Sequence, residues 1–399
     1  MPRGVRILVG DAVERLRELP AGSVQMCVTS PPFYGLRDYG VEGQIGLEAT
    51  PELWVARLVE VFREVRRVLR DDGVLWVEVG DSYTGPPRLR FGDQGKGLHR
   101  GDSEAHDALR ARTSIPVGMK QKDLLGQPWM LAFALRADGW FLRSEVIWAR
   151  PNPMPESVTD RPTKAHSTVF LLSKRARYFY DADAIREPST GDQRPRNTNG
   201  QRERTDLVRG FDNRVTSPDR NARSVWSIPT QPLRDEHYAA FPEELARRCI
   251  LAGSSEYGCC AGCGAPWVRV VDVKYVKSPV HGEGSTVRGR GEPVDVNGWA
   301  GEKMPRLNKE VHTVGWEPSC GCVGEGVKPC VVLDPFLGSG TSALVARKLG
   351  RECVGVELSP VYAEMALRRL RDPDALNRAA LAADGPAQLA LVEGDGTGG

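Results

Sequence analysis

Two short segments, about three hundred residues apart in this 399-residue chain, carry residue types that could perform chemistry. The first, Thr29-Ser30-Pro31-Pro32-Phe33-Tyr34, sets a hydroxyl and a backbone carbonyl beside an aromatic ring, and its prolines remove backbone donors and freedom. The second, Asp334-Pro335-Phe336-Leu337-Gly338-Ser339-Gly340-Thr341, contains the glycines of a turn whose backbone N–H groups could approach a nucleotide-like ligand. Together they indicate an enzyme.

Alternating strand and helix patterns surround both segments and would place them in one α/β sheet. Apolar residues at near 3.6 spacing predict a long helix over 52–69, which Asp71-Asp72-Gly73 would end. The other predicted strands are 5–9, 24–29, 74–79, 139–148, 168–172, 331–333 and 353–356. The other predicted helices are 12–19, 128–138, 241–251 and 342–349, followed by a last helix that closes the 331–370 region. This order is that of a doubly wound sheet.

The glycine-containing segment has the context of a ligand site rather than of a plain turn. It follows a strand and opens a helix, and the next strand ends in Glu357, about where such folds place the acid that binds ribose hydroxyls. A dinucleotide oxidoreductase is the competing interpretation. The Asp-Pro-Phe start and the missing third glycine disfavour it.

The two motifs resemble those of the amino-methylating DNA methyltransferases, which carry [Ser/Asp/Asn]-Pro-Pro-[Phe/Tyr] and Phe-x-Gly-x-Gly. Because the Pro-Pro motif comes first, the chain is similar to the circularly permuted β group of that family. The resemblance implies an α/β fold with a Rossmann-like doubly wound sheet, the circularly permuted methyltransferase fold, with loop insertions. It extends to 80–83, 147–155 and 160–166, but departs from the family pattern at Ser167 and at Ala149-Arg150.

The resemblance also implies the ligand and the residues that bind it. The ligand would be S-adenosylmethionine, bound by Asp334, Phe336, Gly338, Gly340, Thr341 and Glu357, with weaker matches at Asp11, His237 and Phe241. Thr341 would cap the following helix, and a helix-capping His237 is an equal alternative to ligand contact. The catalytic residues would be Ser30, Pro31, Pro32 and Phe33, which hold the amine of a base rotated out of duplex DNA.

The resemblance implies double-stranded DNA as partner, with a cognate restriction endonuclease as a further candidate, in restriction–modification or phage and host DNA modification. Serine at the first motif position favours cytosine N4 over adenine N6 as target. Two alternatives stay open: a catalytically silent DNA-binding specificity subunit, and an amino or amide methyltransferase acting on RNA or protein.

Composition changes along the chain divide it into predicted regions. Residues 1–185 would form the catalytic half, with a basic loop at 85–122 that holds eight Lys/Arg against four Asp/Glu. Residues 186–223 contain nine arginines and six acids, and 186–225 would be the target recognition region. The predicted remainder is a return segment at 226–258, a cysteine-bearing insertion at 259–325, the cofactor-binding half at 326–372 and a disordered tail at 373–399.

The nine cysteines suit metal ligation better than a disulfide framework. Two close pairs, Cys260 with Cys263 and Cys320 with Cys322, match a closed tetrahedral Zn²⁺ site, a zinc knuckle in which Cys259 is a rival ligand. Free structural cysteines are the plain alternative. Cys27, Cys249, Cys330 and Cys353 are expected to be buried apolar residues.

Bulk composition bounds the remaining expectations. A hydrophobic content of 40% is enough for a core, and no run reaches the roughly 20 apolar residues that span a bilayer. We therefore expect a cytoplasmic protein without a membrane partner, as monomer or homodimer. The net charge of +2 gives little information about nucleic acid.

Overall fold

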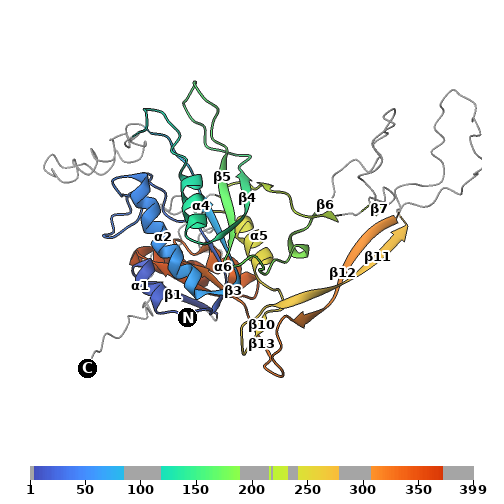
Figure 1. Cartoon of the computed structure of the whole chain (residues 1–399). Helices are drawn as coiled ribbons and strands as arrows, with labels where there is room; N and C mark the ends of the chain where they lie inside the picture. The colour runs from blue at the N-terminus through green and yellow to red at the C-terminus, as the bar shows by residue number, and fades with distance from the viewer. Residues whose placement is uncertain are drawn as a thin grey trace, which may run out of the picture. The chain divides into compact units, whose positions relative to one another are not determined.

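Eight strands form one mixed sheet in the order β1-β15-β14-β2-β3-β5-β4-β9 (Figure 1). The structure is a computed structural model that describes residues 4–84, 118–188, 215–216, 219–231, 241–277 and 307–371. Most of the predicted basic loop 85–122 and of the predicted recognition region 186–225, together with His237 and the tail 373–399, lies outside these residues. The sheet confirms the predicted α/β doubly wound class.

The strands of this sheet are β1 (Val5–Val9), β2 (Val24–Thr29), β3 (Leu69–Val79), β4 (Phe141–Ala149), β5 (His166–Ser173), β9 (Val225–Ser227), β14 (Val331–Asp334) and β15 (Glu352–Glu357). The five strands from β1 to β3 in the sheet order are parallel, and β5 is antiparallel to both of its neighbours. The two motif-bearing strands are adjacent, because Val332 pairs with Met26 and Leu333 with Cys27. Segments about three hundred residues apart therefore end side by side.

Helices cover both faces of the sheet. They are α1 (Ala12–Arg17), α2 (Pro51–Val68), α4 (Gln127–Ala137), α5 (Glu243–Gly253), α6 (Thr341–Lys348) and α7 (Pro360–Arg371). Side chains of α1, α2 and α4 share one buried cluster with Cys27 and Leu75 of the sheet. Met26 and Val74, the alternate residues of the same strands, contact Gly253 of α5 on the opposite face. In the described residues, no helix has the length and apolar character needed to cross a bilayer.

Helix α2 shows how the sequence sets these boundaries. Thr50 caps its first turn by accepting from the Leu53 N–H, and Pro51 occupies the first helical position. The helix ends at Val68, and β3 begins at Leu69 rather than at the predicted Val74. Pairing of Leu69 with Val24 in the sheet outweighs the turn preference of the Asp71-Asp72-Gly73 segment.

The chain divides into two units, of which the second comprises residues 182–222 and 268–317. Its described elements include the long strands β11 (Trp267–Lys277) and β12 (Leu307–Pro318), with the short β7 (Val215–Thr216) beside β12. The remaining short elements of the chain are β6 (Glu187–Pro188), β8 (Asp219–Arg220), β10 (Cys259–Cys260), β13 (Val327–Lys328) and the 3-10 turn at Asp183–Ile185. The strands β11 and β12 were not predicted. Val271, Val273 and Tyr275 of β11 are exposed, so these apolar side chains add little to a core.

Two glycines at the ends of α6 allow a matched test of packing at the turn before this helix. Gly340 has φ +80°, and an added Cβ would lie 2.8 Å from the Ala366 Cβ of α7, whereas Gly350 has φ +73° and open space around it. We expect Gly350→Ala to cost about 1–2 kcal/mol of unfolding free energy from backbone strain alone. Gly340→Ala should cost about 1–3 kcal/mol more, because α7 must move. Urea unfolding of both variants measures the difference, and equal costs would contradict the close contact.

Candidate active site

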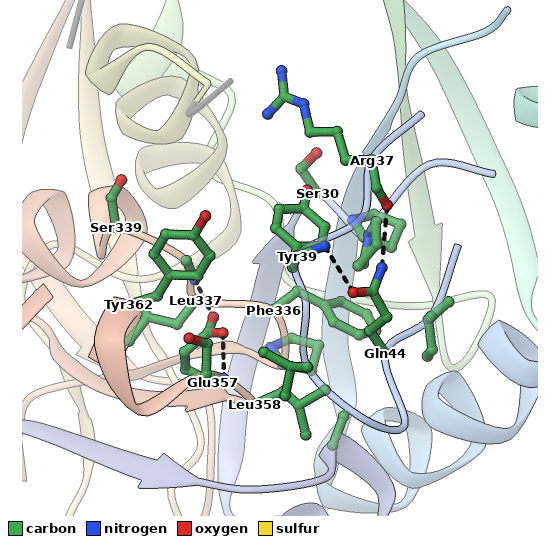
Figure 2. A pocket seen from close by; sticks show the side chains of 18 of the residues that line it. Ser30, Arg37, Tyr39, Gln44, Phe336, Leu337, Ser339, Glu357, Leu358 and Tyr362 are labelled. Atoms are coloured by element: carbon green, nitrogen blue, oxygen red, sulfur yellow. Dashed lines mark hydrogen bonds between the residues drawn. The ribbon is translucent and has the colours of Figure 1, made fainter. Parts of the chain in front are cut away.

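An open pocket lies at the carboxyl edge of the parallel strands, where ligands bind in doubly wound sheets (Figure 2). Ser30, Pro31, Pro32 and Phe33 after β2 and Phe336, Gly338 and Thr341 after β14 line it together. The segments that follow β1 and β15 complete the wall with Asp11 and Glu357. The two motifs therefore share one cavity of about 1180 Å³, its solvent-facing mouth included.

Gly338 lines the pocket with backbone alone. The residue has φ +54°, and a Cβ added there would point into open space. Its N–H donates to Oε2 of Glu357 at 2.7 Å. A side chain at this position would fill part of the cavity, which explains the glycine.

Glu357 faces the pocket with a carboxylate held at both oxygens. Oε2 accepts from the Gly338 N–H and Oε1 accepts from the Ser359 N–H at 2.9 Å (Figure 2). Burial raises the pKa of this carboxyl, while backbone hydrogen bonds from Ser359, Gly338 and Leu358 favour its charged form. Because a carboxylate offers about four acceptor sites, it can still accept from a ligand hydroxyl.

Asp334 and Gly340, both predicted to bind the ligand, lie behind the pocket wall rather than on it. Asp334 is 1% exposed; it accepts from the Thr29 hydroxyl at 2.6 Å, from the Phe336 N–H at 3.0 Å and from the Ser342 hydroxyl. Burial raises the pKa of the Asp334 carboxyl. This side chain positions the turn and the end of β2, whereas Gly340 permits contact between α6 and α7.

The other residues predicted to bind the ligand differ in whether they line the pocket. Asp11 and Phe241 line the pocket, and Asp11 also caps α1 by accepting from the N–H groups of Val13 and Glu14. Thr341 lines the pocket but does not cap α6: the N-cap residue is Gly340, and the Thr341 hydroxyl accepts from Arg369 at 2.7 Å. The predicted cap was wrong because the left-handed Gly340 already ends the turn. His237 lies outside the described residues.

The Ser-Pro-Pro-Phe segment is fixed by contacts with three residues outside it, Trp54, Glu78 and Gly80. The Ser30 hydroxyl donates to Oε2 of Glu78 in β3 at 2.6 Å. Nε1 of Trp54 in α2 donates to the Pro32 carbonyl at 2.8 Å. The Phe33 ring packs so closely on Gly80 that a Cβ there would lie 2.6 Å from the ring. The motif is thus rigid before any ligand arrives.

Glu78 was not predicted as a site residue, although it is the one acid in the apolar run Val74–Val79. Its side chain is buried, and burial raises the pKa of its carboxyl, against hydrogen bonds from Ser30 and Ser167 and the charge of Arg150. A buried carboxyl in a sheet strand costs stability unless it has such partners. An acid within an apolar strand was therefore the sequence signal that could have identified Glu78 as a site residue.

A loop after the Pro-Pro motif adds pocket residues that the sequence interpretation also missed. Oε1 of Gln44 accepts from the Tyr39 N–H at 2.7 Å, and its Nε2 donates to the Arg37 carbonyl at 3.1 Å (Figure 2). Tyr39 and Tyr362 of α7 meet edge to face, with ring centroids 6.0 Å apart. Tyr39 lines the pocket, whereas Tyr34 does not, and its hydroxyl donates to the Ala49 carbonyl.

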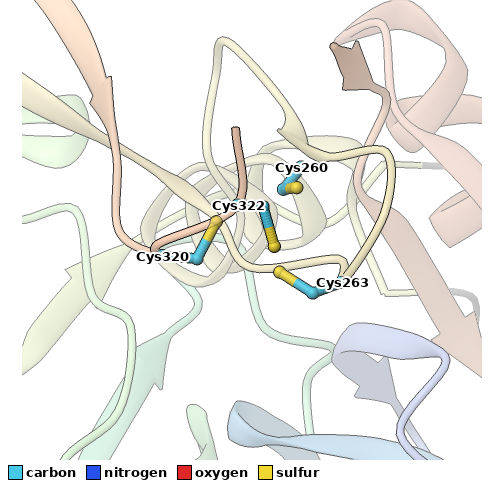
Figure 3. Close-up of side chains that lie close together, drawn as sticks. All are labelled: Cys260, Cys263, Cys320 and Cys322. Carbon is cyan, nitrogen blue, oxygen red and sulfur yellow. The ribbon is translucent and has the colours of Figure 1, made fainter. Parts of the chain in front are cut away.

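The four predicted zinc ligands come together away from this pocket. Their Sγ atoms all lie within 4.8 Å of one another (Figure 3). Cys259 is not one of the four: its thiol donates to the Pro329 carbonyl. Cys27, Cys249, Cys330 and Cys353 are buried, as predicted.

Three arginines of the predicted recognition region, Arg186, Arg220 and Arg223, are described, and the first two are engaged within the second unit. Arg186 forms ion pairs with Asp183 and Asp219, and Arg220 with Glu187 at 2.9 Å. These two residues therefore support local structure. The other arginines of 189–214 lie outside the described residues.

Comparison with known proteins identifies relatives over most of the chain. A family model described as DNA methylase, for N6 and N4 methyltransferases, matches residues 24–287 and 329–368. Type II methyltransferase M.Cfr9I of Citrobacter freundii is 36% identical over 371 residues, which cover 93% of this chain and 89% of that protein. Type II methyltransferase M.SmaI of Serratia marcescens is 36% identical over 368 residues, which cover 92% and 91%. The solved PvuII DNA methyltransferase, cytosine-N4-specific, has a similar fold, with a TM-score of 0.50, 14% identity and 94% of each chain covered.

The buried Glu78 predicts a pH-dependent effect on stability. Because its folded-state pKa is raised, the folded protein holds a proton that the unfolded chain releases, so this carboxyl lowers stability as pH rises through the raised pKa. Glu78→Gln removes the charge. We expect the unfolding free energy of the variant, relative to that of the parent, to increase above about pH 4. The increase is up to about 1.4 kcal/mol per pH unit between the unfolded and the raised folded pKa of Glu78. Urea unfolding from acid to neutral pH measures this gain, and a constant difference would contradict it.

Proposed function

Since the chain belongs to the N6/N4 DNA methylase family and is a DNA methyltransferase, we propose that it uses S-adenosylmethionine to methylate the exocyclic amine of a base. Cytosine N4 is the favoured target over adenine N6. The observation that carries this proposal is the single cavity lined by Ser30 and Gly338, at the ends of the paired strands β2 and β14. It supports a reaction in which donor and acceptor meet.

The donor side of the cavity fits S-adenosylmethionine. Gly338 leaves open space that a Cβ would fill, and the apolar side chains of Phe336 and Leu337 lie beside it. Glu357 keeps acceptor sites for ribose hydroxyls, and Asp11, which follows the neighbouring strand β1, lines the pocket for the adenine end. S-adenosylmethionine supplies a methyl group on a positively charged sulfur when bound. The residues that would hold it are Asp11, Phe336, Gly338, Thr341, Glu357 and Phe241.

The acceptor side limits what Ser30 can do toward a substrate. The hydroxyl has one hydrogen, and it is donated to Glu78, so toward an amino group Ser30 can only accept. The Pro31 carbonyl is the second proposed acceptor. An exocyclic amine is a poor nucleophile because its lone pair is delocalised into the ring. Two fixed acceptors for its hydrogens favour localisation of that pair on nitrogen.

A base in duplex DNA has to leave the helix to reach this cavity, at a cost of a few kcal/mol. Phe33 offers a ring for stacking, and its contact with Gly80 holds it in place. Tyr39 provides a second aromatic side chain on the pocket wall. Stacking on such rings offsets about 1–3 kcal/mol per base.

The DNA contacts and the biological setting are the finer parts of the proposal. Residues 186–225, rich in arginine, are proposed as the target recognition region, since arginine binds phosphate and reads guanine edges. The naming of both relatives as Type II methyltransferases supports a role in restriction–modification beside a cognate endonuclease. Serine at the first motif position supports cytosine as the base.

Methyl transfer to DNA is the direct test. Purified protein incubated with labelled S-adenosylmethionine and duplex DNA should yield labelled N4-methylcytosine after digestion to nucleosides. Label in N6-methyladenine would overturn the choice of base. Label found only in RNA or protein substrates, or no label with tightly bound DNA, would overturn the reaction in favour of the two alternative functions.

Substitution of Ser30 should lower the turnover rate and leave the affinity for S-adenosylmethionine unchanged. We expect Ser30→Ala to lower kcat by about 10²-fold, the usual effect of removing a preorganised hydrogen-bonding group, with an unchanged Kd for S-adenosylmethionine by calorimetry. Ser23→Ala is the matched control, because Ser23 precedes the opposite end of β2 and its hydroxyl donates to the Pro20 carbonyl. Equal kcat for the two variants, or a weakened donor affinity in Ser30→Ala, would contradict the assigned role.

A further inference from the structure

Four thiols meet at a place that the methylation chemistry does not use. Cys260 is the last residue of β10, Cys263 lies in the turn that follows it, and Cys320 and Cys322 follow β12 (Figure 3). The Sγ atoms lie within 4.8 Å of one another, and all nine cysteines are free. In tetrahedral Zn²⁺ coordination with Zn–S bonds of about 2.3 Å, the sulfur atoms are about 3.8 Å apart. Small side-chain movements bring the four thiols to that geometry.

Backbone N–H groups already donate hydrogen bonds to two of the four sulfurs. The N–H groups of Gly262 and Cys263 donate to the Cys260 sulfur, and the Cys322 N–H donates to the Cys320 sulfur. Gly264, directly after Cys263, has φ +73°, and its N–H donates to the Cys260 carbonyl at 2.8 Å, which closes the turn between the two thiols. We propose that these four cysteines bind one structural Zn²⁺ ion and leave it no open position for substrate.

The topology gives the ion a specific task. The chain leaves the first unit after Trp267 and returns to it at Pro318. The two cysteine pairs therefore lie on either side of the inserted residues 268–317. The Ser319 hydroxyl donates to the Pro266 carbonyl at 2.5 Å, which already brings the two ends together. A Zn²⁺ ion bound by four thiolates would join the segment before residue 268 and the segment after residue 317 far more strongly than this hydrogen bond.

The knuckle is also attached to the central sheet. Nε2 of Gln25 in β2 donates to the Gly264 carbonyl at 3.1 Å, and Oε1 of Gln25 accepts from the Val331 N–H at 2.6 Å. A guanidinium nitrogen of Arg70 donates to the Cys263 carbonyl. Gln25 is at the amino end of β2, whereas Ser30 follows its carboxyl end. The ion therefore lies at the edge of the sheet opposite the pocket and serves to hold the insertion.

Metal analysis of the full-length protein tests this site independently of its methylation activity. Protein purified under reducing conditions without chelator should contain one zinc per chain by mass spectrometry. The double variant Cys263→Ser/Cys322→Ser should contain none, and Cys259→Ser, the adjacent buried cysteine, should keep the ion. Iron in place of zinc, no metal in the parent, zinc retained in the double variant, or zinc lost from Cys259→Ser would each overturn the proposal.

Limited proteolysis tests the structural task. Removal of zinc, by chelator or in the double variant, should raise the rate of cleavage within 268–317 several-fold and leave cleavage within 4–84 unchanged. Equal protection of the insertion with and without zinc would show that the ion does not hold it. General unfolding would instead expose both regions, and would equally contradict a local role.

Discussion

The hydrogen bond between Thr29 Oγ1 and Asp334 Oδ1 joins the two halves of the active site. Thr29 is the last residue of β2 and Asp334 the last of β14, and both side chains are buried. Pairing of the two strands sets their relative register, and this contact fixes the ends from which the catalytic and cofactor segments begin. A shift of one residue would place each side chain on the other face of the sheet and separate Ser30 from Gly338.

Three acidic side chains near the C-terminal ends of the parallel strands are buried and hydrogen-bonded in the same way. Asp334, Glu78 and Glu357 are all buried, and burial raises the pKa of each. Each one accepts hydrogen bonds from a segment that lines the pocket: Asp334 from the glycine-containing turn, Glu78 from Ser30, and Glu357 from Gly338. The stability lost by burying an acid is the cost of a rigid site, since the same groups hold loops that would otherwise fluctuate.

Much of this site could be predicted from the sequence because its signals are local. The Pro-Pro motif, the glycine-containing turn and the spacing of the cysteines each occupy a few consecutive residues, and strand-helix alternation places them at strand ends. What stayed hidden depends on tertiary contacts. No pattern near Ser30 indicates that its partner is Glu78, 48 residues away, or that Asp334 points inward to Thr29 and not to the ligand. The caps of α6 and the start of β3 likewise follow from packing and strand pairing.

Strand β2 connects two sites of different kinds. At its amino end Gln25 contacts the cysteine knuckle and the start of β14, and at its carboxyl end Thr29 and Ser30 contact Asp334 and Glu78. The residues between them, from Met26 to Val28, are buried and are held by neighbours on both sides. Such a strand does not bend easily, so contacts of the cysteine-bearing segment at one end of the strand leave the geometry at the other end undisturbed. The cysteine-bearing segment is compatible with a precise site because the two contact opposite ends of the same rigid element.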